Sequence, residues 1–521
     1  MNMFYRSAAA PLCLGVVLLA MAGISACSKK DHKSSGGTTS DTTATGTELS
    51  AADEDSLKYL MYRNMQVDIN DIGDNQDLPA YYWYKSVPTL DPHSSIYPNA
   101  DTLLNVMRQY AINATTGNPY DKYSFLDRDS SISTELEDGK VEATKAVEGD
   151  FGIQVVFAAD NNNDVHTLVE YADKNSPAGK AGLTRGTELI SVNGITDFSS
   201  VTNRESVWNA FYSGNATVSL ITQQFGSSVQ SSITLSAAAY NINPILFDTI
   251  YNTTQGNVGY FVFYTFTNTY NSAGSPTLTK QLLDAEIGKL KSANINNLIV
   301  DLRNNGGGAV ATAEYLDSAL APSSAAGKTM YWTTYNDKLN AAIGVSGNGD
   351  ETKFPSSTGG LSLDHIFFIV NDGTASAAEL TMNNLKPYMD VKLVGDTTYG
   401  KPVGFIGASL RAHRNGKEIY LADLYAINFE TKNSLLQGGY FTGIVPDQLA
   451  QDYVDVPFGN ADYDENLLDI FNYINTGRFT TNGRQVTPLQ QSGRVKQSSL
   501  NTHIKSLRFN GMINFRAKQL K

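Results

Sequence analysis

Cysteine is almost absent from this chain of 521 residues, which has only Cys13 and Cys27. A zinc site built on cysteines and a cysteine nucleophile are therefore excluded from everything after residue 27. No apolar run after residue 30 is long enough to cross a bilayer. Basic charge is also scarce, because 39 Lys and Arg face 52 Asp and Glu and the net charge is −13. This balance argues against general nucleic-acid binding.

Residues 1–26 differ from the rest and predict a lipoprotein signal peptide. Arg6 precedes an apolar stretch of small residues, which is typical of a secretory signal. The stretch ends with Ile24-Ser25-Ala26-Cys27, which resembles the bacterial lipobox. That resemblance implies that Cys27 is the lipidation site and carries palmitate-type acyl chains. It also implies a lipoprotein of the bacterial cell envelope that is anchored to the outer membrane, on either the periplasmic or the surface face. An ordinary signal peptide or an anchor helix is the alternative. Cys13 would leave with the signal, so we expect no disulfide.

Hydrophobic residues make up 41% of the chain, enough for roughly two to four domains. Residues 27–50 are small and polar and predict a flexible tether. Residues 51–140 predict a helical N-terminal domain, in which we expect the aromatic residues to be buried rather than to bind a ligand. Residues 451–521 form a C-terminal extension with a basic tail. That tail is either solvated or contacts lipopolysaccharide, a membrane or the acidic body of the protein.

Residues 150–238 predict a β-rich domain. They combine a strand entered by a glycine turn, a short helix after Ser176-Pro177-Ala178, and a strand ending at Asn193-Gly194. This series resembles a PDZ domain, which implies that a peptide adds a strand to the sheet edge and that loop amides hold its C-terminal carboxylate. The peptide-binding residues would be Gly149, Phe151, Gly152 and Ile153. A β-rich domain without a ligand is the alternative.

Residues 241–450 predict an α/β core with two similar strand–turn–helix units. In the first, the buried strand 297–302 leads into Arg303-Asn304-Asn305-Gly306-Gly307-Gly308 and a helix over 309–320. In the second, the strand 366–370 leads through Ser376 into a helix over 377–388. Further strands are expected at 258–266, 329–334, 405–411 and 418–429. Ser376 would sit where the first amides of a helix point at whatever its hydroxyl attacks.

A serine hydroxyl is a good nucleophile only when a neighbouring group accepts its proton. None of the six histidines lies in a glycine-framed turn. A lysine can act instead if its pKa of ~10.4 falls by about 3 units, which burial can achieve. Lys401 is suitable, because Gly400 permits a close turn and Pro402 favours an extended backbone at Lys401. We therefore predict Ser376 as nucleophile and Lys401 as base, although a loop lysine is more commonly a surface residue.

The oxyanion formed by such an attack needs hydrogen-bond donors. The amide of Ala377 and one amide from 306–308 are the candidates. Glycine triplets also occur in ordinary turns, so the triplet alone is weak evidence. Phosphate binding is disfavoured, because no Gly-Lys-Ser/Thr sequence ends the turn.

Together these motifs resemble the C-terminal processing protease family of serine peptidases over about 150–450. The quoted stretches are 301–308, Gly373-Thr374-Ala375-Ser376-Ala377-Ala378-Glu379, Thr398-Tyr399-Gly400-Lys401 and Gly443-Ile444-Val445-Pro446-Asp447. The resemblance implies a crotonase/ClpP-like core, a Ser376–Lys401 dyad, Gly307 and Ala377 as oxyanion donors, and no cofactor or metal. Many members have Gln four residues after the lysine, where this chain has Phe405.

We therefore expect a multidomain α+β protein that acts as an exported, lipid-anchored serine endopeptidase. Its partners would be protein or peptide substrates, which it would hold by their C-terminal tails. It would also bind a membrane through its lipid, and we expect no binding of nucleic acid. The rival hypothesis is a non-catalytic peptide-binding lipoprotein that retains the protease scaffold, which Phe405 favours. A crotonase-like acyl-CoA enzyme is disfavoured, because export separates it from cytosolic thioesters.

Overall fold

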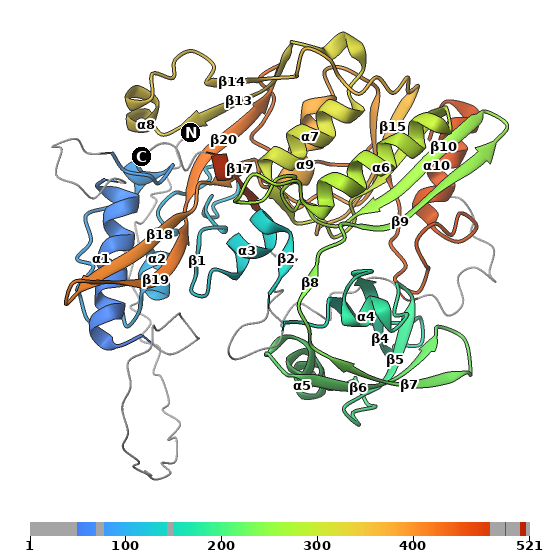
Figure 1. Cartoon of the computed structure of the whole chain (residues 1–521), viewed down its shortest axis with the longest axis horizontal. Helices are drawn as coiled ribbons and strands as arrows, with labels where there is room; N and C mark the ends of the chain where they lie inside the picture. Colours follow the sequence, from blue (N-terminus) through green and yellow to red (C-terminus); the bar gives the residue numbers. More distant parts are fainter. Residues whose placement is uncertain (1–48, 69–77, 143–148, 480–494, 496–510, 517–521) are drawn as a thin grey trace, which may run out of the picture. The chain divides into compact units, whose positions relative to one another are not determined.

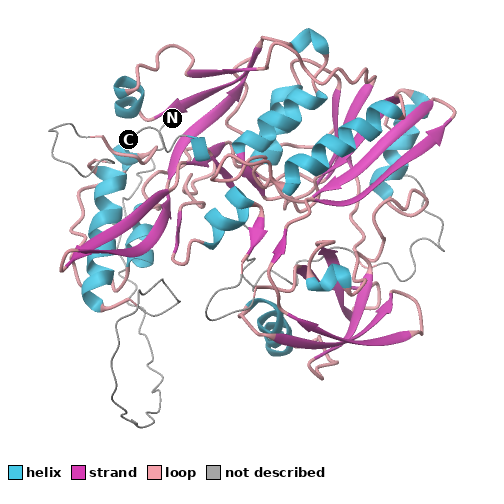
Figure 2. Cartoon of the chain, in the orientation of Figure 1, coloured by secondary structure: helices cyan, strands magenta, loops and turns pink. Residues whose placement is uncertain are grey.

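The computed structural model describes residues 49–68, 78–142, 149–479, 495 and 511–516. All of them belong to one compact unit, Ala44–Lys521. The predicted signal peptide, the lipidation site Cys27, most of the tether and most of the basic tail lie outside the described residues. Within the described part, every helix is too short or too polar to cross a bilayer. Figures 1 and 2 show a mixed α/β architecture.

The N-terminal segment packs its helices against strands from much later in the chain. Its elements are α1 (Ala51–Gln66), η1 (Tyr84–Ser86), α2 (Ala100–Met107), β1 (Phe125–Asp127) and α3 (Ser131–Asp138). The apolar face of α1 shares one core with α2 and with β18 (Ala408–Arg414) and β19 (Lys417–Tyr425). Because β1 also pairs with β19, this segment and the later strands form one structural layer.

The region after residue 149 is a five-stranded antiparallel sheet with the order β3-β4-β5-β6-β7. Its elements are β3 (Ile153–Ala159), β4 (Val165–Ala172), α4 (Pro177–Lys180), β5 (Thr187–Val192), α5 (Val201–Tyr212), β6 (Thr217–Gln224) and β7 (Gln230–Ser236). The side chain of Ser176 caps α4 by accepting from the amide of Gly179. β3 is an edge strand, and the Tyr212 hydroxyl accepts from its Val155 amide at 3.0 Å and donates to its Ile153 carbonyl at 3.1 Å.

A six-stranded sheet with the order β21-β16-β15-β11-β10-β9 forms the centre of the α/β core. Its strands are β9 (Ile245–Thr253), β10 (Gly256–Phe263), β11 (Ile295–Asp301), β15 (His365–Val370), β16 (Val391–Gly395) and β21 (Gln448–Leu449). All neighbouring pairs are parallel except β9 with β10. Helices therefore cover both faces, as parallel sheets require.

Three helices, α6 (Leu278–Ser292), α7 (Val310–Leu320) and α9 (Ala377–Leu385), pack on one face of this sheet (Figure 1). α10 (Glu465–Thr476) packs on the other. Successive residues of the strands point to opposite faces, so Phe368 contacts the first group of helices and Phe367 the second. Because helices cover both faces of the sheet, the β15 residues Ile366–Val370 are all apolar.

A second six-stranded sheet has the order β12-β22-β17-β20-β13-β14. Its strands are β12 (Gly307–Ala309), β13 (Thr329–Tyr335), β14 (Asp350–Lys353), β17 (Val403–Phe405), β20 (Ile427–Asn433) and β22 (Gly511–Ile513). This sheet brings the glycine turn at Gly307 close to the strand that follows Lys401. The remaining elements are β2 (Lys140–Val141), which pairs with β8 (Tyr240–Asn241), η2 (Ser323–Ala325) and α8 (Asp337–Ala342).

A buried ion network joins the five-stranded sheet to the α/β core. Arg185, between α4 and β5, is 2% exposed and donates to the Val456 carbonyl at 3.0 Å and to the Asp452 carboxylate. Asp452 also accepts from Arg303 at 2.8 Å, and Arg303 belongs to the predicted glycine turn. The network thus fixes one edge of that turn.

Candidate active site

Ser376 occupies a strained turn between β15 and α9. Its backbone has φ 59° and ψ −107°, a region that costs a non-glycine residue of the order of 1–3 kcal/mol. The turn is held by the Ala375 amide, which donates to the Asn305 carbonyl at 2.9 Å, and by the Thr374 hydroxyl, which donates to the Leu302 carbonyl at 2.8 Å. The two predicted strand–turn–helix units therefore meet, and each supports the other.

The carboxylate of Glu379 joins the loops of the predicted nucleophile and base. Its Oε2 accepts from the backbone amides of Ser376 and Lys401, each at 2.8 Å. These two nitrogens therefore lie within twice that distance of each other. Its Oε1 accepts from the Gly400 amide at 2.8 Å and from the Thr398 hydroxyl. The two segments that the sequence paired are thus brought together at one buried side chain.

Glu379 belongs to the motif at 373–379, but the sequence alone assigns it no role. A signal was present, because Ser376-x-x-Glu379 matches the capping-box pattern in which the glutamate bonds to the N-cap amide. Burial raises the pKa of Glu379, and the hydrogen bonds from Thr398, Ser376, Lys401 and Gly400 act in the opposite direction. The capping-box pattern does not indicate that Glu379 lies inside the site rather than on the surface of the helix.

Lys401 is fully buried among aromatic rings. Its Nζ lies 3.8 Å from the ring centroid of Phe405 and 4.9 Å from that of Tyr123. Burial holds the pKa of Lys401 well below its usual range. The charges of Asp121 and Glu379 act against this shift, and the charge of Lys122 acts with it. A neutral amine is the form that can accept a proton.

The two expected oxyanion donors lie side by side. Ala377 is the first residue of α9, so its amide has no acceptor within the helix. Gly307 has φ 101°, and a Cβ on it would fall 2.9 Å from the Ala377 nitrogen and 2.5 Å from the Gly511 carbonyl oxygen. Only glycine fits there. The Gly307 amide itself donates to Asn305 Oδ1 at 2.9 Å, so that bond must break before it can bind an oxyanion.

The Ser376 side chain is fully buried, and its hydroxyl has no hydrogen-bond partner among the described residues. Hydrogen bonds of catalytic groups are often formed only when substrate binds. A substrate carbonyl can reach this hydroxyl only after a local rearrangement of the surrounding loops.

A cleft of about 550 Å³ runs between the expected peptide loop and the glycine turn. Gly149, Phe151, Gly152 and Ile153 line one part of it, and Gly306 and Gly307 line another. Its charged lining residues are Asp129, Glu135 and Asp150, with no basic residue among the described ones. Asp150 accepts from the Gly152 amide and the Tyr240 hydroxyl, so one amide of the loop is already occupied.

His365, one of the two histidines within the predicted α/β core, is not placed to act on Ser376. His365 starts β15, whereas Ser376 follows the opposite end of that strand. His365 contacts Asp390 at 2.6 Å, a pairing that was not recognised in the sequence. Lysine therefore remains the candidate base.

Replacing Glu379 by Gln should destabilise the protein by about 2–6 kcal/mol. Gln offers one acceptor oxygen, so two of the four donors lose their partner, at about 1–3 kcal/mol for each buried group. Urea denaturation of Glu379→Gln and of the exposed control Glu418→Gln measures the difference. A loss below about 1 kcal/mol would contradict the role of Glu379 as the tie between the loops.

Lys401→Met should raise the melting temperature, and by more at lower pH. The folded pKa of Lys401 lies below the unfolded value of 10.5, so unfolding takes up a proton between these values. That uptake favours the unfolded wild type increasingly as pH falls from 10.5 toward the folded pKa. Melting curves from about pH 6 to about pH 10 test this. A difference that does not change with pH would show that the buried amine is charged.

Known proteins resemble the chain in the region just described. Residues 257–448 match peptidase family S41. The carboxy-terminal processing protease CtpA of Bacillus subtilis is 29% identical over 245 residues, which are 46% of this chain and 45% of the relative. CtpB of the same organism is 24% identical over 288 residues, which are 55% of this chain and 52% of the relative. The chain thus spans about half the length of these curated relatives.

The fold has a counterpart among solved structures. A crystal structure assigned to the S41 proteases, from Bacteroides fragilis, has a TM-score of 0.58 and 20% identity, and the match covers 81% of this chain and 97% of that one. At this identity the likeness concerns the fold alone. Residues 257–448 are thus similar to peptidase family S41, and the chain resembles C-terminal processing proteases in about half of its length.

Proposed function

We propose that this protein is an exported, lipid-anchored serine endopeptidase that cleaves polypeptides near their C-termini. The observation that carries the proposal is the shared carboxylate of Glu379, which holds the loops of Ser376 and Lys401 together. The buried amine of Lys401, whose pKa is lowered by burial, supplies the base.

The chemistry would proceed in two stages. Lys401 accepts the proton of the Ser376 hydroxyl as its oxygen attacks the substrate carbonyl carbon. The amides of Ala377 and Gly307 donate to the resulting oxyanion, and the field at the start of α9 adds to this stabilisation. As the intermediate collapses, the carbon–nitrogen bond breaks, the ammonium of Lys401 returns the proton to the leaving nitrogen, and the acyl group stays on the Ser376 oxygen as an ester. Water hydrolyses the ester on Ser376, with Lys401 again acting as base.

Substrate would reach this centre through the cleft. A peptide that pairs with the edge strand β3 would lie beside the loop at 149–153, as in PDZ-type recognition, and would replace the Tyr212 hydroxyl at Ile153 and Val155. The same cleft extends to Gly307, so a segment upstream of the bound tail can approach the oxyanion donors. A tail carboxylate that binds Gly152 must displace Asp150 from its amide.

The proposed anchor rests on the lipobox resemblance at Cys27. Cys27→Ser should move the protein from the membrane fraction to the soluble fraction. Recovery of that variant in the membrane fraction would contradict lipid anchoring.

A non-catalytic peptide-binding lipoprotein is the second candidate. The buried Ser376 and the apolar Phe405 near Lys401 favour it. In that case the cleft would bind peptides, but the hydroxyl would remain unreactive.

Ser376→Ala should lower the cleavage of an unfolded protein such as casein by at least about 10³-fold. Peptide binding should persist, because the loop at 149–153 is unchanged. A labelled fluorophosphonate should react with the wild type and with the exposed control Ser356→Ala, but not with Ser376→Ala. Equal cleavage by Ser376→Ala would rule out the assigned nucleophile, and an unreactive wild type would favour the binding protein.

The cleft should prefer basic tails. Asp129, Glu135 and Asp150 attract Lys and Arg side chains and repel acidic ones. Burial, followed by the nearby charge of Asp150, raises the pKa of Glu135 to about 8, so this preference should strengthen as pH rises through that value. Competition between matched Lys-rich and Glu-rich tail peptides measures it. Equal binding of the two in low salt would contradict a role for these carboxyl groups.

A further inference from the structure

Glu379 holds the amides of the Lys401 loop, and the side chain of Phe405 has no polar atom with which to hold the rest of that loop. We propose that the turn Asp121-Lys122-Tyr123-Ser124 positions the base. Tyr123 would clamp the loop, and Lys122 would add a neighbouring positive charge to the burial that already disfavours the ammonium of Lys401. This inference rests on the proposed function. It assigns a role in the same site to a segment outside the 257–448 match.

The turn is rigid because its acid uses its hydrogen-bonding capacity internally. Asp121 is 1% exposed, and its Oδ1 accepts from the amides of Tyr123 and Ser124 at 2.9 and 2.8 Å. Its Oδ2 accepts from the hydroxyls of Ser124 and Tyr81 at 2.6 and 2.7 Å. With four donors on one carboxylate, the backbone of Tyr123 is held in one place.

Tyr123 contacts the base loop with both its hydroxyl and its ring. The hydroxyl donates to the Gly400 carbonyl at 2.5 Å, and Lys401 Nζ lies 4.9 Å from the ring centroid. The Gly400 amide donates to Glu379, as described above. Gly400 is thus held at its N–H by one side chain and at its carbonyl by another, which fixes the backbone that carries Lys401.

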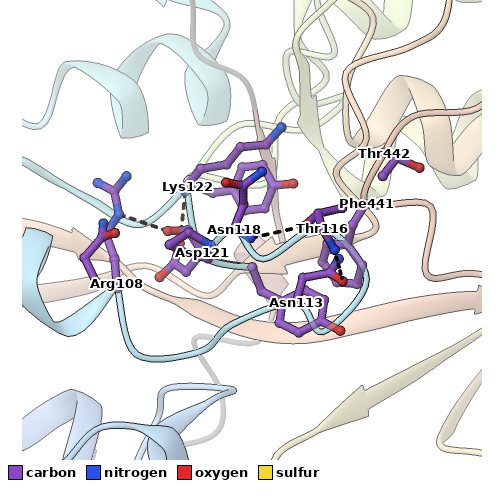
Figure 3. Close-up of a pocket in the computed structure, with 12 residues that line it drawn as sticks. Arg108, Asn113, Thr116, Asn118, Asp121, Lys122, Phe441 and Thr442 are labelled. Carbon is purple, nitrogen blue, oxygen red and sulfur yellow. Dashed lines mark hydrogen bonds between the residues drawn. The ribbon is translucent and has the colours of Figure 1, made fainter. Parts of the chain in front are cut away.

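The Lys122 amine lies against the same Tyr123 ring as the Lys401 amine, and burial lowers the pKa of Lys122 as well. Its Nζ lies 4.2 Å from the ring centroid of Tyr399 and 5.4 Å from that of Tyr123. Among the described residues no carboxylate forms a salt bridge with it. Its side chain also lines an open cavity of about 350 Å³, together with Arg108 (Figure 3). Two nearby ammonium groups each disfavour the charged form of the other.

Other groups around Lys401 set the background for this effect. Asp121 and Glu379 favour the ammonium, but both carboxylates are already bonded to four donors. Arg108 adds positive charge near Tyr399. Tyr123, Tyr399 and Tyr440 stay neutral, because burial raises the pKa of each hydroxyl. Lys122 is thus the cation placed to oppose the two acids.

The test is the pH dependence of fluorophosphonate labelling of Ser376 in the full chain. The labelling rate should rise with pH as Lys401 loses its proton. Lys122→Met should move this rise to higher pH, with labelling at pH 7 about threefold to tenfold slower and the high-pH plateau within about twofold of wild type. Lys122→Arg should restore the wild-type curve, and the exposed control Lys291→Met on α6 should not change it. Tyr123→Phe should lower the plateau without moving the rise.

Three results would overturn the inference: an unmoved curve for Lys122→Met, the same shift in Lys122→Arg, or an unchanged plateau in Tyr123→Phe. Thermal melting establishes whether each variant is folded. If Tyr123→Phe does not fold, the comparison of Lys122→Met with Lys122→Arg decides the test. Failure of the proposed function gives a different result from failure of this inference. If the proposed function is wrong, Ser376→Ala and the wild type will show the same fluorophosphonate labelling and the same cleavage. If Ser376→Ala is inactive and Lys122→Met behaves as wild type, the protease assignment stands and only this inference fails.

Discussion

Four hydrogen bonds to one carboxylate hold this site together. Glu379 sits in the first turn of α9, and its two oxygens accept from the turn before the helix and from the loop 19 to 22 residues further along the chain. The strained backbone of Ser376 and the buried amine of Lys401 are both unfavourable on their own. They persist because the same acid fixes both backbones. An acid that reacts with nothing thereby determines where the reacting groups lie.

The surroundings of Lys401 combine opposing effects. Aromatic rings exclude water and disfavour the ammonium, whereas Asp121 and Glu379 favour it. Each acid is surrounded by donors that spread its negative charge over several groups. The pKa of Lys401 is therefore lowered without removing the acids that the loops need for their geometry. Function and stability compete here, since a buried neutral lysine gives up the hydration of its charge.

Local patterns predicted the parts of the site but not its assembly. Glycine-framed turns after apolar strands located Ser376 and the Gly307 turn, because a strand, a turn and a helix leave signals within about 20 residues. The Tyr123 hydroxyl and the Gly400 carbonyl are 277 residues apart in sequence, so no periodicity could relate them. The residues at which strands begin and end also depend on which other strands they pair with. The strand expected at 405–411 is divided between β17, which ends at Phe405, and β18, which begins at Ala408, because the two parts join different sheets.

β22 has a consequence for the order of events in the life of the protein. Residues Gly511–Ile513 pair with both β12 and β17, between the glycine turn and the strand that follows Lys401. A ribosome makes these residues more than 100 positions after Lys401. The sheet that supports the loops of Ser376 and Lys401 therefore stays incomplete until Gly511–Ile513 have been made. A nascent chain that stops before Gly511 lacks this support for the loops of Ser376 and Lys401.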